Sequence, residues 1–160
     1  MIVVADASPL RYLVLIELSD VLHKLYGTVF VPPAVIAELS QERTPAVVQA
    51  WIDRMPTWLH VQAPTQVPVP INEVLGPGEL AAIALAEELS ADALLIDDRD
   101  GRAEAKARGL LVLGTLRVLA DAAEHGFVDL SAAIDRLRRT NFRASEQLIQ
   151  WLLERDRRRQ

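Results

Sequence analysis

The chain has 160 residues, 51% of them hydrophobic, which is the size of one domain with a substantial core. It has no cysteine, so disulfides and thiolate metal sites are excluded, and its histidines (His23, His60 and His125) lack zinc-site spacing. The net charge of −5 is unevenly spread: residues 1–129 hold nine Lys/Arg and 18 Asp/Glu, whereas residues 130–160 hold eight Arg and four acids.

Strand and helix signals alternate along the chain, a pattern typical of an α/β domain with a mainly parallel sheet. Residues 2–5 predict a buried strand, followed by a helix with Ser8 as its N-cap and Pro9 at its first position, which ends near Glu17. A second helix, capped by Ser19 or Asp20, ends near Gly27. Further strands are expected at 28–31, 58–62, 93–96 and 110–113, and further helices at 34–39, 44–55, 78–90, 101–109, 115–126, about 131–139 and 145–157.

Residues 63–78 are rich in proline and predict an irregular loop. Because neither side of this loop is long enough for a two-layer domain, we expect a single domain over residues 1–160, with a core in 2–126 and C-terminal helices in 131–160. The last of these helices has an apolar face that we expect to pack on the core, with a second copy of the chain as the alternative; it is formed by Leu148, Ile149, Leu152 and Leu153 with Trp151.

The sequence shows neither a secretory signal nor a membrane-spanning segment. No run of about 18 apolar residues is free of charge or proline, and the first residues, MIVVADASPL, do not resemble a secretory signal. We therefore expect a cytoplasmic protein without a membrane span. The arginine-rich segments DRLRRTNFR and ERDRRRQ are interpreted as a solvated helix face and a frayed end, with nucleic-acid phosphate or an acidic partner as the alternative.

Acidic residues follow the predicted strands at the points where they end. Asp6 follows the strand at 2–5, and Asp97 and Asp98 follow the strand at 93–96. Glu38 lies in the helix after the strand at 28–31. Because ligands of open α/β sheets collect at the carboxyl ends of the strands, we expect these side chains to meet there.

Glu79 opens the helix predicted at 78–90. It shares a helical stripe with Ala82, Ile83 and Ala86, which places it toward the core side. A glutamate in a first turn is also favoured by the helix dipole alone, so a functional and a purely structural interpretation have equal support.

A cluster of this kind requires neutralisation. Two carboxylates about 4 Å apart repel by roughly 4 kcal/mol at an effective dielectric constant of about 20, so several together need protons or cations. Oxygen ligands without histidine or cysteine favour Mg²⁺ or Mn²⁺, and such ions suit phosphodiester hydrolysis. Taken singly, each acid is also explained as a turn or N-cap residue.

Four segments, in this order, resemble PIN domains: VVADASPL, VPPAVIAEL, LGPGELAAIALA and LLIDDRDGRAEAKARGLLVLGTLRVL. The resemblance spans about residues 2–126 and is closest to the prokaryotic subgroup related to VapC-type toxins. It implies a three-layer α/β/α fold around a mainly parallel sheet of about five strands. It also implies a ribonuclease that cleaves single-stranded RNA with Mg²⁺ or Mn²⁺, the toxin of a type II toxin–antitoxin pair, with a cognate antitoxin partner and a homodimeric state.

The resemblance assigns catalytic and metal-binding roles to four acids. Asp6 is the first, with Ser8 as its hydroxyl neighbour, and Glu38 is the second. Glu79 is the third, where the family usually has aspartate, and Asp98 is the fourth, with Asp97 as the alternative.

Three neighbours of these acids have supporting roles. Asp100 would hold a water on the metal or act as a further metal-binding residue, and Arg99 and Arg102 would offset the negative charge or contact a phosphate. RNA binding is expected to depend on the arginine-rich tail and to weaken with salt.

Two other functions are weighed beside this one. The first is a non-catalytic PIN-like module whose acids hold a structural cation or a basic partner. The second is a phosphotransferase with Asp6 as nucleophile, which is disfavoured because Ser8 stands where such enzymes place a second aspartate.

Overall fold

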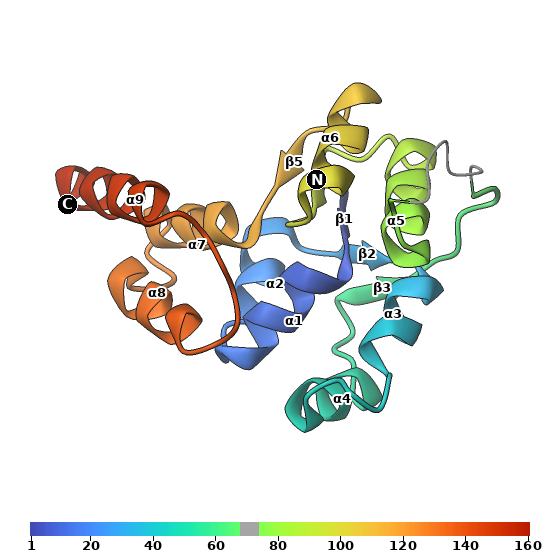
Figure 1. Ribbon diagram of the computed structural model, residues 1–160, viewed down its shortest axis with the longest axis horizontal. Helices are drawn as coiled ribbons and strands as arrows, with labels where there is room; N and C mark the ends of the chain where they lie inside the picture. The colour runs from blue at the N-terminus through green and yellow to red at the C-terminus, as the bar shows by residue number, and fades with distance from the viewer. Residues whose placement is uncertain (68–73) are drawn as a thin grey trace.

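The fold is built around a five-stranded sheet in which every neighbouring pair is parallel. The computed structural model describes residues 1–67 and 74–160. The strand order is β3-β2-β1-β4-β5, and the strands are β1 (Val3–Ala5), β2 (Val29–Val31), β3 (Leu59–Val61), β4 (Ala93–Leu95) and β5 (Val112–Leu113). The predicted three-layer α/β/α fold is confirmed (Figure 1).

The helices of the described residues follow the predicted order, with ends shifted by a few residues. They are α1 (Ala7–Leu15), α2 (Asp20–Tyr26), α3 (Pro33–Leu39), α4 (Ala46–Asp53), α5 (Pro77–Glu88), α6 (Arg99–Ala107), α7 (Thr115–Glu124), α8 (Leu130–Arg138) and α9 (Glu146–Arg159). None of the helices in the described residues is long and apolar enough to cross a membrane.

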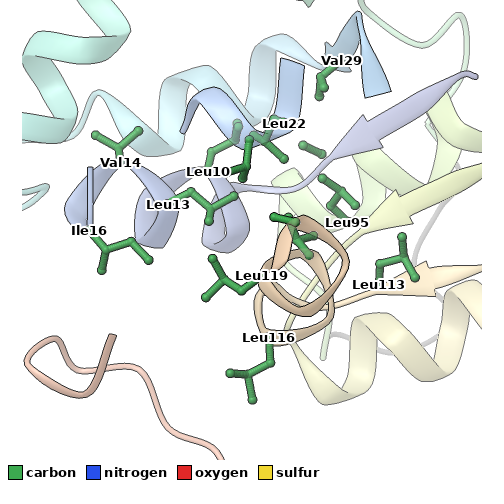
Figure 2. Packing of buried hydrophobic residues seen from close by; sticks show 14 of the residues in the cluster. Leu10, Leu13, Val14, Ile16, Leu22, Val29, Leu95, Leu113, Leu116 and Leu119 are labelled. Atoms are coloured by element: carbon green, nitrogen blue, oxygen red, sulfur yellow. The ribbon is translucent and has the colours of Figure 1, made fainter. Parts of the chain in front are cut away.

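The side chains of each strand alternate between two apolar layers, as strand geometry requires. Val3, Ala5 and Leu95 lie in a cluster with residues of α1, α2, α4 and α7, whereas Val4 and Leu94 lie in a second cluster with α5 and α6. Figure 2 shows the first layer, where the leucines of α1 and α7 meet beneath the strands. Because helices cover both faces of the sheet, a functional site is expected at the ends of the strands.

The strand order reverses direction between β1 and β4. From β1 the chain builds outward through β2 and β3, and it then returns to place β4 and β5 on the other side of β1. At the carboxyl end of this pair, the backbone N–H of Asp6 donates a hydrogen bond to the carbonyl of Leu95 at 2.8 Å. Such a reversal opens a crevice between the two loops that follow the strands.

The C-terminal helices differ from two expectations. α9 continues to Arg159, where the Arg159 guanidinium donates a hydrogen bond to the carbonyl of Ala123 at 3.1 Å, so the expected frayed end is wrong. The apolar face of α9 is only partly covered: Ile149 and Leu152 are buried, but Leu148 and Trp151 are 44% and 54% exposed. α9 packs along α7 and α8, and these helices are too few to cover its whole face (Figure 1).

The loop predicted at 63–78 lies partly outside the described residues. Its described parts, 63–67 and 74–76, contain neither helix nor strand, and α5 begins at Pro77, one residue before the predicted start. Glu88 accepts hydrogen bonds from the backbone and the hydroxyl of Thr65, which attaches the start of the loop to α5.

Candidate active site

Asp6 lies at the centre of the carboxyl edge of the sheet. It occupies the N-cap position of α1, yet its side chain makes no capping hydrogen bond to the helix. The residue is only 3% exposed, and its Oδ1 has no hydrogen-bond partner among the described residues. Burial, together with the charges of Glu79, Glu38 and Asp97, raises the pKa of Asp6 to about 7. A buried, unpartnered carboxylate oxygen is costly unless a proton or cation satisfies it.

Asp97 extends from the end of β4, the strand paired with that of Asp6. Its two oxygens accept hydrogen bonds from Thr115, Oδ1 from the backbone N–H at 2.8 Å and Oδ2 from the hydroxyl at 2.7 Å. Burial raises the pKa of Asp97, and the hydrogen bonds from Thr115 oppose that rise. Gly114 leaves room for this arrangement, because a Cβ there would stand 3.1 Å from Asp97 Oδ1.

Glu38 approaches the edge from α3, the helix that begins with Pro32 and Pro33 after β2. The side chain is exposed and passes over the first turn of α5, where a Cβ on Gly78 would lie only 2.9 Å from Glu38 Oε2. A glycine at this position therefore allows the close approach of α3 and α5 that brings Glu38 to the edge.

Glu79 lies in the first turn of α5 and is half-buried, as its position on the apolar stripe predicts. Its Oε2 accepts a hydrogen bond from the backbone N–H of Gly76 at 3.3 Å, which is one half of a capping box, since Gly76 has no side chain to make the other half. Burial and the charge of Asp98 raise the pKa of Glu79, with smaller contributions from Glu38 and Asp100. The neighbouring carboxylate charges thus agree with the functional interpretation of Glu79, and the hydrogen bond from Gly76 agrees with the structural one.

Asp98 and Asp100 lie at the start of α6. Asp98 is the N-cap, and its Oδ2 accepts a hydrogen bond from the backbone N–H of Gly101 at 2.8 Å. Asp100 is exposed in the first turn, and its negative charge contributes to the raised pKa of Glu79. The charge of Asp97 therefore raises the pKa of Asp6, whereas the charges of Asp98 and Asp100 raise the pKa of Glu79.

The predicted supporting residues are spread around the carboxylates. Ser8 and Glu38 line a pocket of about 300 Å³ together with Arg11 and Arg43. Arg102 Nη1 donates a hydrogen bond to the carbonyl of Ile96 at 3.2 Å and lowers the pKa of Asp97 against the effect of burial. Arg99 is exposed at the start of α6.

The family of the chain follows from a comparison with family models. The model of DUF3368, described as a PIN domain, matches residues 2–157, which is nearly the whole chain. The chain belongs to the PIN domain family. PIN domains are generally nucleases. The match extends the predicted resemblance, which ended near residue 126, through α8 and most of α9.

A solved structure supports the same fold for this PIN domain. The similar protein is a PilT N-terminus domain protein from the hyperthermophilic archaeon Sulfolobus solfataricus P2, at 24% sequence identity and a TM-score of 0.57. The similarity covers 78% of this chain and 96% of the other. No curated protein matches the sequence.

The side chains of this PIN domain suit a hard cation in their chemistry. All of the converging groups are carboxylates, and the buried Oδ1 of Asp6 is an oxygen donor without a partner among the described residues. Within residues 1–67 and 74–160, however, no three acidic or histidine side chains are close enough together to hold a metal ion. Glu79 and Asp98 each accept a hydrogen bond from a backbone N–H of their own helix start.

Three residues that shape the PIN-domain site are not found by sequence reasoning. Thr115 is fully buried and fixes Asp97, and Gly78 and Gly114 provide space for Glu38 and Asp97. A signal for Thr115 was present, because it comes two residues after the strand at 110–113, close to the strand end as Asp6 is to the end of the first strand. The two glycines carry no such signal, since their role depends on packing between distant segments.

Proposed function

We propose that this PIN domain is a divalent-metal-dependent endoribonuclease that cleaves single-stranded RNA. The observation that carries the proposal is the buried Oδ1 of Asp6, which lacks a partner among the described residues and lies beside Asp97 where the strand order reverses. Membership of a family of nucleases supports the reaction class. The absence of histidine and cysteine among these side chains favours Mg²⁺ or Mn²⁺.

Some of these residues would bind the cation, and others would orient its ligands or attract the phosphate. Asp6 and Asp97 would hold the cation from the two paired strands, with Glu38, Glu79 and Asp98 completing the set from three helices. A bound cation of this type stabilises charge on phosphate oxygens and makes water a better nucleophile at neutral pH. Thr115 would orient the Asp97 carboxylate, and Arg102 would attract the phosphate.

The direct test is cleavage of a fluorescently labelled single-stranded RNA with Mg²⁺, with Mn²⁺ or with EDTA. We expect cleavage only with a divalent ion, and a loss of at least about 100-fold in Asp6→Asn. Asp135→Asn is the matched control, because Asp135 is an exposed aspartate on α8, far along the chain from the site. Equal cleavage by the wild type and Asp6→Asn would refute the assignment.

A second candidate is a PIN-like binding module without catalysis, in which the acids hold a structural cation or a basic partner. The hydrogen bond from Gly76 to Glu79 favours it, because it gives this glutamate a structural use at the third acid position. Calorimetric titration with Mn²⁺, read together with the cleavage assay, distinguishes the candidates, because a structural cation would bind without cleavage of RNA. A catalytic site predicts Mn²⁺ binding that depends on Glu79 and Asp98, together with RNA cleavage.

We further propose that the chain is a VapC-like toxin that acts as a homodimer and is controlled by an antitoxin. The sequence resemblance is the support for these three points. Light scattering across micromolar concentrations tests the dimer, and a constant monomer mass would contradict it. Expression together with the product of a neighbouring small reading frame tests the antitoxin, since a cognate antitoxin should form a complex with the chain and suppress RNA cleavage.

A further inference from the structure

We propose that the groove between α9 and the carboxyl edge of the sheet binds one nucleotide of single-stranded RNA, with the base against Trp151 and the phosphate among Arg102, Arg117 and Arg143. This groove has a volume of about 450 Å³, within the usual range for small-ligand pockets. The proposal rests on the proposed function, because it places the substrate of that same site.

The groove is continuous with the carboxylates through Asp97. Asp97 lines the groove, and so does Gly114, the glycine that leaves room for the Asp97 side chain. A nucleotide in the groove would therefore lie next to the acids at the ends of β1 and β4. This position suits a residue of RNA adjacent to the bond that is cut.

The basic side chains of the groove complement a phosphate. Arg102, Arg117 and Arg143 all line it, although residues 1–129 as a whole carry twice as many acids as bases. Arg117 forms an ion pair with Asp121 through Nε at 3.0 Å, which leaves its outer nitrogens available. Arg143 is exposed and makes no ion pair within residues 1–67 and 74–160. Guanidinium groups suit phosphate because they can donate two hydrogen bonds at once.

The apolar side chains of the groove complement a base. Trp151, Phe142 and Leu148 line it, and the Trp151 side chain is 54% exposed even though tryptophan is usually covered in folded proteins. Base stacking on an exposed aromatic ring is a common mode of single-strand binding and does not require a particular base. The groove therefore offers apolar side chains for a base beside arginines for a phosphate.

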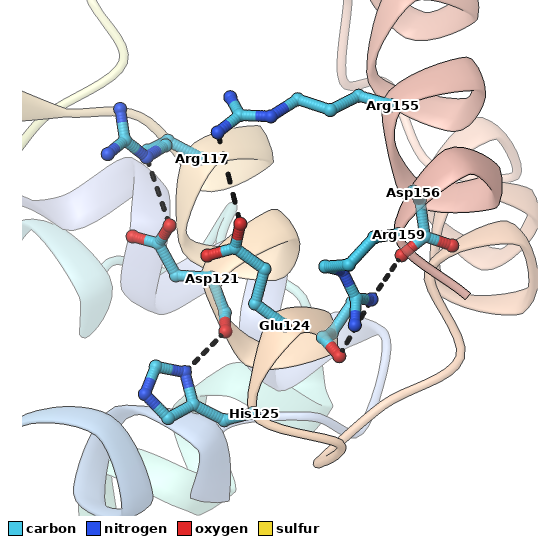
Figure 3. A network of polar contacts seen from close by, with 8 residues as sticks. Arg117, Asp121, Glu124, His125, Arg155, Asp156 and Arg159 are labelled. Atoms are coloured by element: carbon cyan, nitrogen blue, oxygen red, sulfur yellow. Dashed lines mark hydrogen bonds and ion pairs between the residues drawn. The ribbon is translucent and has the colours of Figure 1, made fainter.

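The helix that carries Trp151, α9, is attached to α7 by side-chain contacts. Arg155 lies 5.5 Å from the centre of the Trp151 ring. Figure 3 shows that Arg155 pairs with Glu124 of α7, at 3.9 Å, and that Arg159 donates hydrogen bonds to Asp156 and to the carbonyl of Ala123. On the other wall, Phe142 packs edge-on against Tyr12 at 5.0 Å. Both sides of the groove are therefore positioned before a ligand arrives.

Binding of uncut RNA tests the inference separately from cleavage. Fluorescence anisotropy would be measured with a labelled ten-nucleotide single-stranded RNA in EDTA, in an Asp6→Asn background. We expect Trp151→Leu to weaken binding about tenfold and Trp151→Phe to weaken it by less than about threefold, because phenylalanine keeps a ring for stacking. Arg143→Ala should weaken binding and lower the salt dependence by about one released ion.

Two controls match these variants. Leu111→Ala removes an exposed apolar side chain at the opposite end of the sheet, and Arg54→Ala removes an exposed arginine at the end of α4, outside the groove and outside the arginine-rich tail. Neither should change RNA affinity. Circular dichroism shows whether each variant folds, and if Trp151→Leu does not fold, Arg143→Ala still decides the outcome.

Several results would overturn the inference. These are unchanged affinity in Trp151→Leu and Arg143→Ala, no RNA binding by the parent protein at low salt, or a change of oligomeric mass in Trp151→Leu with RNA affinity intact, which would make the groove a contact between copies. Binding that depends on Trp151, without cleavage of RNA by the wild type in Mn²⁺, would instead support the groove and refute the proposed function.

Discussion

Thr115 donates two hydrogen bonds to Asp97, from its backbone N–H to Oδ1 and from its hydroxyl to Oδ2. Thr115→Val keeps the shape and the backbone bond but removes the hydroxyl, so one oxygen of a largely buried carboxylate loses its donor. We expect the free energy of unfolding to fall by about 1–2 kcal/mol and RNA cleavage to fall with it. Urea denaturation measures the first effect. Thr28→Val, at an exposed position, is the control.

Gly78→Ala should separate stability from activity. Alanine is favoured over glycine in a helix, so we expect stability to rise slightly, by about 0.5 kcal/mol. The new Cβ would stand 2.9 Å from Glu38 Oε2 and displace that flexible carboxylate, so cleavage should fall about tenfold. Gly76→Ala is the control, since a Cβ there meets nothing within 4 Å. Full activity in Gly78→Ala would show that the position of Glu38 does not matter.

Glu79→Gln distinguishes the two interpretations of this residue. The amide oxygen of glutamine can still accept the hydrogen bond from Gly76, so this bond and the stability should be kept to within about 0.5 kcal/mol. The charge is lost, so Mn²⁺ affinity should fall about tenfold or more by calorimetry if Glu79 binds the cation. Unchanged Mn²⁺ affinity would leave capping as its role.

Asp6 should make the metal-free protein less stable as the pH rises. Its pKa is about 7 in the folded chain and 3.8 as the reference value, so its contribution to stability is fully present below about pH 4 and is lost as the pH rises through 7. Asp6→Asn removes this loss. In EDTA, we expect the urea-derived stability of Asp6→Asn, relative to the wild type, to increase by roughly 2–4 kcal/mol from pH 4 to pH 8. A constant difference between the two proteins would contradict the raised pKa.

Mn²⁺ binding should depend on pH for the same reason. At pH 6 a carboxyl with a pKa of about 7 is mostly protonated and must release its proton to bind a cation, whereas at pH 8 it is mostly ionised. We therefore expect Mn²⁺ affinity to be about tenfold lower at pH 6 than at pH 8. Asp135→Asn should show the same dependence as the wild type. A flat affinity profile would mean that Asp6 is not a ligand.

The fold and the central acids are predictable because they depend on local patterns. The strands, the helices and the positions of Asp6 and Asp97 at strand ends follow from apolar runs and from the residues that terminate them. Thr115 was missed because its contact with Asp97 requires the β4–β5 register, in which Leu95 lies opposite Leu113. Gly78 was missed because its role depends on how α3 packs against α5.

The groove beside α9 could not be predicted from the sequence pattern either. Helical periodicity indicates an apolar face on α9 but not how much of that face the neighbouring helices cover. Ile149 and Leu152 are buried on it while Leu148 and Trp151 are not. The part that was not predicted is the part to which we assign RNA binding.

The pairing of β1 with β4 has a consequence for the synthesis of the protein on the ribosome. Asp6 emerges early, but the strand that brings Asp97 beside it spans Ala93–Leu95, and Thr115 follows later still. Until that long-range pairing forms, the two halves of the site are separated by about ninety residues of chain. A nascent chain therefore cannot bring Asp6 and Asp97 together until most of its synthesis is complete.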